Sequence, residues 1–474
     1  MEGRQDHSKR LAAGAAMVDI TPKAGTHLGG EWQKLRKAEH VEDHLYARCI
    51  ILRHGYEELC IISLDSAIIT RQYSDRIKVI INSNFGINED SIIISTTQTH
   101  SAPAIGNIII DNEFEGIPPE HEYLRGSQAE YCDWAVERTI EAVTAAREQE
   151  RPVQAAAGRA MIDGLAFNRR AVLRNGKVSM PSPFPSITHP LGLTDVLYLE
   201  GPTDPEVSIF CLRDDDMRMV AMILHHTCHP VNVFANARHT ISADWPGSWA
   251  TEMQNQHGEQ SIPLVFNGCC GNINPWPVFV PDFKPDHIAM GHKLAEASAR
   301  IIETLEFQET SDIDWAQRTV GLPLRKPAPA DLARAQELIE KHPTPIWSDS
   351  DPLQVEAQWM DAAMLIGCER ERARSPVYEY DIQALRVGNT AFVGLAGEPF
   401  VEAQLAIKLD SPFAHTLIAH GTNDCPGYIA PRSTYQRGGH EIRDIPAKWA
   451  KLEQGAMEAI VENTTDMLQQ LFAT

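Results

Sequence analysis

The sequence predicts an α/β (α+β) protein with a large mixed β-sheet core flanked by helices and a helical insertion in its C-terminal half. Three observations support this prediction. The chain has 474 residues, of which 43% are hydrophobic and 22% charged, so it can bury a large core. Short β-branched runs alternate with stretches of helical spacing. Between Lys326 and Ser375 the composition shifts to Ala, Glu, Arg, Leu and Gln, which favour helices.

Strands are predicted where apolar residues run continuously over a few positions, because such runs are typical of strands buried on both faces. The first is the Ala/Gly-rich run Leu11–Val18, which we interpret as a strand rather than a signal peptide because it is short and leads directly into Asp19-Ile-Thr-Pro. The others are Cys49–Leu52, Leu59–Asp65, Ser91–Ser95, Met219–Leu224, Leu264–Phe266, Tyr378–Val387, Thr390–Leu395 and Thr416–Ala419.

Helices are predicted where apolar positions recur with helical spacing. One of them, Tyr73–Ile81, lies between two predicted strands and gives a β-α-β arrangement. The others are Glu130–Arg147, two or three helices within Lys326–Ser375, Phe400–Leu409 and a long terminal helix over Lys448–Leu471. We expect one domain over residues 1–474, with residues 326–375 as a helical insertion within it.

Charge and cysteine content exclude several classes of function. Lys and Arg total 42 against 64 Asp and Glu, a net charge of −22, which repels nucleic-acid phosphates and anionic membranes. No apolar stretch reaches the length of about 18 residues that a membrane span needs. Nine cysteines, an odd number spread over the chain, do not form a disulfide framework and favour a reducing compartment. We therefore expect a cytoplasmic protein without nucleic-acid partners or stable membrane association, and a homo-oligomer is left open.

Chemically capable residues gather directly after the predicted strands, where loops hold functional groups on a rigid scaffold. His100 follows one strand, and His225-His-Thr-Cys-His229 follows another, where one metal ligand and one buried histidine are expected. Further loops of this kind are Ile241–Gly247, Asn267–Pro275, Gly394–Pro399 and the stretch from His420 to Glu441. Imidazoles, a carboxylate and a phenol at strand ends can supply metal ligands and acid–base groups together.

These loops, in this order, resemble the neutral ceramidase family, specifically its N-terminal catalytic domain. The resemblance runs from about Ala15 to Leu471, which leaves no room for the family's separate immunoglobulin-like domain. The matching stretches are Val18-Asp-Ile-Thr-Pro22, Gln98-Thr-His-Ser-Ala-Pro103, His229-Pro, Gly397-Glu398, Gly427-Tyr-Ile and Gly438-Gly-His-Glu441, supported by His44–Arg48, Asn168-Arg169 and Ser242-Ala-Asp244.

The resemblance implies a zinc-dependent hydrolase that cleaves an amide bond, with zinc held by two His, one Glu and one Tyr. His229, Glu398 and Tyr428 fall on three of these positions. The family's first His, the fourth ligand, is replaced here by Gln98, and its second His is matched by His100. Arg169 matches an arginine of the family's site, and His440 stands where the family has a tyrosine in contact with substrate.

A further departure concerns the nucleophile. The ceramidases carry a Ser in a Gly-Asp-Val-Ser-Pro pattern, and the matching stretch here places Asn274 at that position. An amide is not a nucleophile, so Ser-dependent chemistry is not available. Either His100 completes the metal site, or Gln98 does so through its carbonyl oxygen, or the site binds another metal or none. The predicted metal ligands are therefore His100, His229, Glu398, Tyr428 and Gln98, and the predicted catalytic residues are His100, Arg169, His440 and Asn274.

The favoured hypothesis is a hydrolase that uses zinc or another divalent metal to activate water against an amide-type C–N bond. We expect a small polar substrate, since a lipid would call for an exposed apolar surface. Arg169, Arg170 and Arg432 can receive a substrate carboxylate, although ion pairs with the abundant Asp and Glu explain them equally well. The alternatives are a non-hydrolytic metalloenzyme, an isomerase or epimerase of a sugar or hydroxy acid, and a non-catalytic binding protein.

Overall fold

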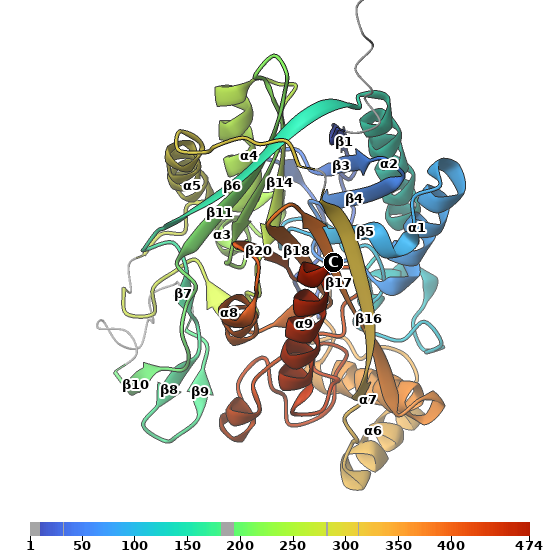
Figure 1. Ribbon diagram of the computed structural model, residues 1–474. Helices are drawn as coiled ribbons and strands as arrows, with labels where there is room; N and C mark the ends of the chain where they lie inside the picture. Colours follow the sequence, from blue (N-terminus) through green and yellow to red (C-terminus); the bar gives the residue numbers. More distant parts are fainter. Residues whose placement is uncertain (1–9, 32, 182–193, 281–282, 311) are drawn as a thin grey trace, which may run out of the picture.

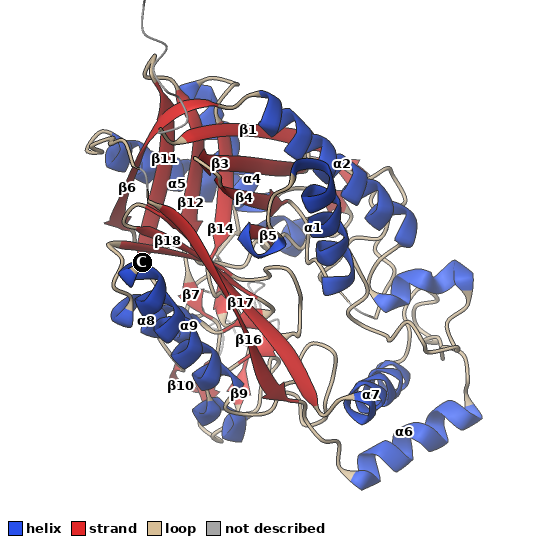
Figure 2. Ribbon diagram, turned by 45° about the vertical axis from the view of Figure 1, so that its right-hand side comes forward, coloured by secondary structure: helices blue, strands red, loops and turns tan. Residues whose placement is uncertain are grey.

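The protein is built in four layers, helices, sheet, sheet and helices (Figures 1 and 2). A computed structural model describes residues 10–31, 33–181, 194–280, 283–310 and 312–474. The prediction of a mixed α+β fold with a large mixed sheet is confirmed. What the sequence does not predict is that the core holds two sheets packed face to face rather than one.

The larger sheet has eight strands in the order β14-β12-β11-β6-β1-β3-β4-β5. β4 and β5 are parallel, as are β12 and β14, and the remaining neighbours are antiparallel. The first strand forms as predicted. The bounds are β1 (Ala12–Asp19), β3 (Tyr46–His54), β4 (Glu57–Leu64), β5 (Ile92–Thr96), β6 (Arg151–Met161), β11 (Glu206–Asp214), β12 (Met219–His226) and β14 (Ile262–Asn267).

The smaller sheet lies on the inner face of the larger one, in the order β16-β17-β18-β20. Three phenylalanines pack edge to face between the two sheets, with ring centres 5.0 Å apart for Phe210 and Phe392 and 5.9 Å for Phe266 and Phe392. Its strands are β16 (Ile313–Pro323), β17 (Val377–Val387), β18 (Thr390–Leu395) and β20 (His415–Ala419), of which only β18 and β20 are parallel.

Helices cover the outer faces of both sheets (Figure 1). On the larger sheet these are α1 (Arg71–Phe85), α2 (Ala129–Glu148), α4 (Asp244–His257) and α5 (His287–Ile302), and on the smaller sheet α8 (Val401–Asp410) and α9 (Ala456–Ala473). The remaining helices are α3 (Asn232–Asn236), α6 (Pro329–Lys341) and α7 (Ala357–Arg374), with short 3-10 turns η2 (Glu89–Ser91), η3 (Pro119–Arg125) and η4 (Arg432–Arg437). Among the described helices, none is long and apolar enough to cross a membrane.

Short strand pairs tie the loops together at one end of the sheets. They are β2 (His40–Val41) with β13 (Thr240–Ile241), β7 (Phe167–Asn168) with β15 (Ile273–Asn274), β19 (Glu398–Pro399) with β21 (Tyr428–Ile429), and the three strands β8 (Ala171–Leu173), β9 (Val178–Ser179) and β10 (Val196–Leu199). Two of these pairs contain residues that the sequence assigns to the candidate site, Asn274 in β15 and Glu398 with Tyr428 in β19 and β21, so the loops that carry them are held in register by backbone hydrogen bonds.

The larger sheet is so strongly coiled that strands far apart in its order meet. Ser63 on β4 donates its hydroxyl to the carbonyl oxygen of Val265 on β14 at 3.0 Å. The Asn267 side chain at the end of β14 donates to the carbonyl oxygen of Thr97, just after β5, also at 3.0 Å. This coiling brings the loops after β5, β12 and β14 to one place, which a flat sheet would keep apart.

Two helices occupy the segment in which two or three were predicted. α6 and α7 lie between β16 and β17, which are themselves antiparallel neighbours, so the chain leaves the smaller sheet and returns beside the strand that it left (Figure 2). The Trp359 side chain of α7 is fully buried in an apolar cluster that also contains Tyr428 and Trp449. These helices therefore pack against the loops around the candidate site.

Several elements differ from the sequence prediction. The terminal helix begins at Ala456 rather than at Lys448. Gly455, directly before it, has a left-handed φ of 99°, and the carbonyl oxygen of Trp449 accepts a hydrogen bond from Tyr428 N–H in the loops of the site. The segment Ile241–Gly247, expected as a loop, contains the first turn of α4. β6, β11 and β16 are not predicted. β6 and β16 have half-exposed, Ala-rich or polar sequences without a continuous apolar run, whereas β11 is buried and does contain one.

The packing of β1 against α2 yields a stability prediction. A Cβ at Gly14 on β1 would lie 1.9 Å from the backbone carbonyl oxygen of Ala146, which cannot move without shifting α2. A Cβ at Gly158 on β6 would instead meet the ends of the Ile301 and Leu305 side chains, which can rotate away. Gly14→Ala should therefore cost about 3 kcal/mol or more of unfolding free energy, and Gly158→Ala clearly less. Urea unfolding of both variants tests this, and equal midpoints would contradict it.

Candidate active site

The segments after six strands, β1, β4, β5, β12, β18 and β20, surround a cavity of about 200 Å³. It is lined by both polar and apolar side chains. The polar ones are Gln98, His100, Glu398, Tyr428 and His440, which the sequence analysis names, together with Glu31 and Arg238. The apolar ones are Ala67, Ile68, Ala104, Ile108, Ile109, Phe234 and Trp449. A neighbouring, more open cavity of about 490 Å³ shares His440 and Trp449 with it.

His229 lies against Glu398, behind the side chains that line the cavity. The Nδ1 atom of His229 is 3.0 Å from the carbonyl oxygen of Ile273, which can only accept, so Nδ1 carries the proton. Its Nε2 atom therefore presents a lone pair, 3.3 Å from Oε2 of Glu398. Neither of these two atoms has a partner that meets hydrogen-bond geometry among the described residues. Two buried acceptors thus face each other.

The charge states of this pair follow from their surroundings. Burial, and then the guanidinium of Arg169, lower the pKa of His229, so its imidazole is neutral. Burial alone would raise the pKa of Glu398, but its cationic and imidazole neighbours outweigh burial and bring that pKa to about 2. A neutral imidazole and an ionised carboxylate are the forms in which these groups bind a metal.

Backbone pairing aligns Glu398 with Tyr428. The two residues are direct partners in the parallel pair β19 and β21, so their side chains leave the same face. Glu398 N–H donates to the carbonyl oxygen of Gly427 at 2.9 Å, and Tyr428 N–H donates to that of Trp449 at 2.8 Å. Burial, and then the charge of Glu398, raise the pKa of the Tyr428 phenol, which holds its proton at neutral pH.

His100 lies beside the pair on the cavity side. Its ring centre is 5.6 Å from that of His229, in an edge-on arrangement. Burial lowers the pKa of His100 to about 3, so the ring is neutral, and its Nδ1 atom has no partner that meets hydrogen-bond geometry among the described residues. Gly30 has a φ of 84° and approaches so closely that a Cβ there would lie 2.5 Å from Nδ1.

Gln98, at the position of the expected first ligand, is held in a strained conformation. Its φ of 63° is left-handed, which is unusual for a residue other than glycine. Its amide lies 2.9 Å from Nε2 of His420 and 3.3 Å from Sγ of Cys270. His420 was noted in the sequence as an imidazole after a strand, but it was not among the predicted site residues.

Arg169 is fixed by a buried carboxylate. Its Nε atom donates to Glu441 at 2.8 Å and its Nη1 atom to the side-chain oxygen of Asn274 at 3.3 Å. Its Nη2 atom is buried and has no partner that meets hydrogen-bond geometry in the described chain. The guanidinium carbon lies 5.5 Å from the centre of the Tyr428 ring, which is itself 5.8 Å from the ring of His440. Arg169 therefore has donor capacity left beside the phenol.

Arg170 is part of the same ion-pair cluster. It donates to Glu441 at 2.5 Å and to Glu200 at 2.7 Å, and its side chain is fully buried. Both arginines are thus already paired with protein carboxylates. Of the two interpretations left open by the sequence, ion pairing accounts for Arg169 and Arg170 better than reception of a substrate carboxylate.

Two solved structures are similar to this arrangement over nearly the whole chain. The crystal structure of neutral ceramidase from Pseudomonas aeruginosa superposes with a TM-score of 0.71 at 15% identity, covering 98% of this chain and 75% of that one. The chain has the neutral ceramidase fold. A ceramidase complexed with C2 gives a TM-score of 0.72 at 15% identity, with coverage of 98% and 76%. No family model matches the sequence, and no curated protein does.

On this ceramidase fold, the site residues predicted from the sequence lie close together, but not all of them line the cavity. Gln98, His100, Glu398, Tyr428 and His440 line the cavity, while His229, Arg169 and Asn274 lie behind them. His225 and His226 are buried in β12, and their ring nitrogens have no hydrogen-bond partners among the described residues. Asp244 accepts from Asn232 and from the backbone of Val233 at 2.8 Å each, which is a structural role.

The donor set for a metal fits in part. Within the described residues, no three His, Cys, Asp or Glu side chains form a group that could hold a metal ion. Gln98 replaces one of the imidazoles that such a group would contain, and Tyr428 is not one of these four residue types. What remains is the buried pair of facing acceptor atoms, His229 Nε2 and Glu398 Oε2, with the phenol aligned beside the carboxylate. That pair fits a cation between the two atoms.

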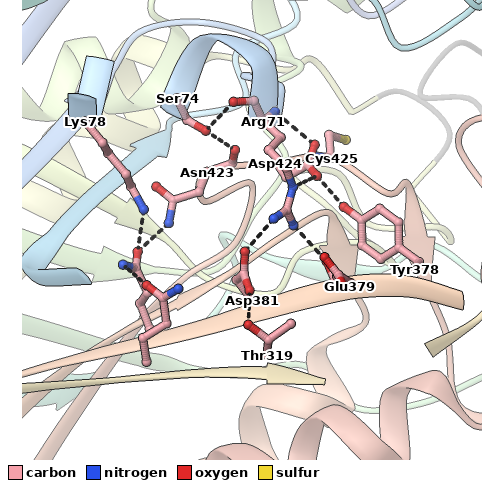
Figure 3. Close-up of polar contacts among 12 residues, drawn as sticks. Arg71, Ser74, Lys78, Thr319, Tyr378, Glu379, Asp381, Asn423, Asp424 and Cys425 are labelled. Carbon is pink, nitrogen blue, oxygen red and sulfur yellow. Dashed lines mark hydrogen bonds and ion pairs between the residues drawn. The ribbon is translucent and has the colours of Figure 1, made fainter. Parts of the chain in front are cut away.

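Asp424, in the loop that leads to Tyr428, connects α1 with the smaller sheet (Figure 3). Its carboxylate accepts from the backbone N–H and the Nε of Arg71, at 3.1 Å each, and from the hydroxyl of Tyr378. Arg71 also donates to Asp381 at 2.6 Å. The carbonyl oxygen of Asp424 accepts from Gly397 N–H at 3.0 Å, one residue before Glu398. The ion pair therefore fixes the loops that carry both Glu398 and Tyr428.

Asn423 joins the same loop to β5. With a left-handed φ of 60°, it donates its backbone N–H to the carbonyl oxygen of Ile94 at 2.9 Å, and its side-chain oxygen accepts from Ile94 N–H at 3.1 Å. β5 leads directly to Gln98 and His100. One two-residue segment thus holds the loops from both sheets together.

Removing the Arg71 side chain should loosen this junction. In Arg71→Met, Asp424 and Asp381 lose their shared cation, at a cost of about 1–3 kcal/mol because the guanidinium is partly exposed. Arg76→Met on the same helix is the matched control, since its pair with Asp133 is exposed and contributes little. Thermal unfolding should separate the two variants, and amide exchange over residues 396–428 should accelerate in Arg71→Met alone. Equal behaviour of the two variants would refute the positioning role.

Glu441 should make stability depend on acid pH. Burial alone would raise its pKa, but Arg169 and Arg170 outweigh burial and hold that pKa at about 2. Because the folded pKa lies below the unfolded value of about 4.3, this contribution is present above that value and is lost as pH falls toward 2. Glu441→Gln should lower stability by about 3–5 kcal/mol at neutral pH and flatten the acid limb of the stability profile. Glu337→Gln, on an exposed pair, should leave the profile unchanged.

Proposed function

We propose that this protein is a metal-dependent hydrolase that cleaves an amide-type C–N bond of a small substrate. The observation that carries the proposal is the pair of buried acceptors, His229 Nε2 and Glu398 Oε2, 3.3 Å apart without hydrogen-bond partners in the described chain. Leaving two such acceptors face to face is costly unless a cation lies between them. The ceramidase fold supports the hydrolase class at a coarse level.

Zinc or another divalent metal would be held by His229, Glu398 and Tyr428, with Gln98 or His100 completing the set. When bound, such an ion lowers the pKa of a water molecule and polarises a substrate carbonyl. The hydrogen bond from His229 Nδ1 to Ile273 keeps the Nε2 lone pair directed at the site, as in other metal centres.

The side chains around the cavity can carry the protons. His100 is neutral, faces the cavity and has an unpartnered nitrogen within the described chain, so it can accept a proton from the attacking water. Arg169, with a donor to spare beside the phenol, can stabilise charge that develops on the substrate oxygen through Tyr428. His440, on the cavity wall beside Tyr428, can orient the leaving group.

Asn274 takes no nucleophilic part in this proposal. Its side-chain oxygen accepts from Arg169, which makes it a positioning residue for the guanidinium. A carboxamide cannot form the covalent intermediate that a serine forms. Direct attack by water is the route that the remaining groups support.

The cavity narrows the expected substrate. A volume of about 200 Å³ fits a small molecule, and seven apolar side chains line the cavity together with the acid–base groups. Glu31 and Arg238 form an ion pair of 2.8 Å, and both line the cavity with Phe234. We propose a small amide that places its polar scissile group against Glu398 and a compact apolar group against Ile68 and Ile109.

Two further points remain proposals. We propose that residues 1–474 form one catalytic domain into which residues 326–375 are inserted, because α6 and α7 leave and rejoin adjacent strands. We also propose that the protein works in the cytoplasm or another reducing compartment, since all nine cysteines are free and buried.

The decisive experiment combines metal analysis with hydrolysis of a panel of small amides. Glu398→Gln should lower activity by at least about a thousandfold and should reduce bound metal, because it removes the only carboxylate paired with His229 in the described chain. Glu462→Gln, an exposed position on α9, is the matched control and should keep both. Chelation should abolish activity, and added divalent metal should restore it.

Three outcomes would contradict the proposal. Full activity of Glu398→Gln would exclude the ligand assignment. The absence of stoichiometric metal in protein purified without chelator would exclude metal dependence. A product with the same mass as the substrate would instead identify the isomerase or epimerase.

A further inference from the structure

The amide of Gln98 has two buried neighbours that together determine which way it points. The atom placed toward them lies 2.9 Å from Nε2 of His420 and 3.3 Å from Sγ of Cys270. The two ends of a glutamine amide have the same shape, so the hydrogen-bonding partners decide which end is oxygen and which is nitrogen. The question is therefore what His420 offers at Nε2.

His420 offers a lone pair. Its Nδ1 atom lies 2.9 Å from the carbonyl oxygen of Asn267, which can only accept, so Nδ1 carries the proton. The same carbonyl accepts from the backbone N–H of His420 at 3.0 Å, which fixes the ring on that side. The ring is fully buried, which disfavours a charged imidazole and leaves the proton on Nδ1 alone. Its Nε2 atom then needs a donor, and the Gln98 amide, at 2.9 Å, lies closer to it than the Sγ atom of Cys270, at 3.8 Å.

An oxygen of Gln98 facing Nε2 would set two lone pairs against each other at 2.9 Å. The amide nitrogen satisfies both neighbours instead, because one of its N–H bonds can donate to Nε2 of His420 and the other to Sγ of Cys270. The oxygen then points away from both, and Gln98 lines the cavity on its other side. The left-handed φ of 63° shows that surrounding contacts hold Gln98 there against a backbone cost.

We propose that Gln98 turns its carbonyl oxygen into the cavity and completes the cation site as an oxygen ligand. The inference rests on the proposed metal-dependent function. It adds the ligand set of the cation site, which would consist of one imidazole nitrogen and of oxygens from Glu398, Tyr428 and Gln98. Carbonyl, carboxylate and phenol oxygens suit harder cations such as Mn²⁺ better than a second imidazole does. The ratio of the Zn²⁺ affinity to the Mn²⁺ affinity of this site is therefore expected to be smaller than it would be with histidine at position 98.

The test compares the affinities of metal-free protein for Zn²⁺ and for Mn²⁺, each added alone and measured by competition with a chromophoric chelator. Gln98→Met keeps the length of the side chain but removes the oxygen, and both affinities should fall by about tenfold or more. Gln98→His should raise the Zn²⁺ affinity by about tenfold or more while changing the Mn²⁺ affinity much less. Unchanged affinities in Gln98→Met, or equal changes for both ions in Gln98→His, would overturn the inference.

A second measurement does not depend on the variants folding. In metal-free native protein labelled with ¹⁵N in glutamine side chains, the Gln98 amide protons should show contacts to the His420 ring. Finding the carbonyl oxygen there would overturn the inference while leaving the proposed function intact. If the native protein binds neither ion, the proposed function itself fails, and the cation part of this inference fails with it.

Discussion

The structure depends on the junction made by Asn423 and Asp424. Asn423 forms hydrogen bonds with Ile94 on the larger sheet. The carboxylate of Asp424 accepts from Arg71, and its carbonyl oxygen accepts from Gly397 N–H. Because these two residues touch both sheets, they set the distance between loops that come from opposite halves of the chain. The His229–Glu398 pair and the alignment of Glu398 with Tyr428 both require that distance. Buried ion pairs and strained backbone are acceptable at such a place because neighbouring structure compensates for their cost.

Local pattern was sufficient for most of the strands that are buried on both faces, although the buried β11 was not predicted. β4, β5, β12, β14, β18 and β20 read as continuous apolar runs, and each was predicted. β16 was not predicted because it is half exposed, and its sequence reveals a strand only when paired with β17. The division of the core into two sheets, and the coiling that brings Asn267 to Thr97, arise from packing between distant segments, which no local window contains.

The site was predictable to a similar extent. His229, Glu398 and Tyr428 follow strands and match family motifs, so their approach could be expected, and the structure brings Glu398 against His229. The roles of His420 and Glu441 could not be expected, because each acts through a neighbour: one orients an amide and the other holds a guanidinium. The sequence did not indicate that Trp449 lines the cavity, because Trp449 was assigned to a helix that begins only at Ala456, seven residues later.

The wide separation of the site residues along the chain has a consequence for folding. His100, His229 and Glu398 belong to three segments far apart in the sequence, so no short fragment contains the facing pair of His229 and Glu398. The entropy of closing such long loops must be overcome before any contact in the site offsets it. The cavity is therefore expected to form among the last features of the molecule, after the sheets have packed, and only once the segment that carries Glu398 and Tyr428 has been synthesised.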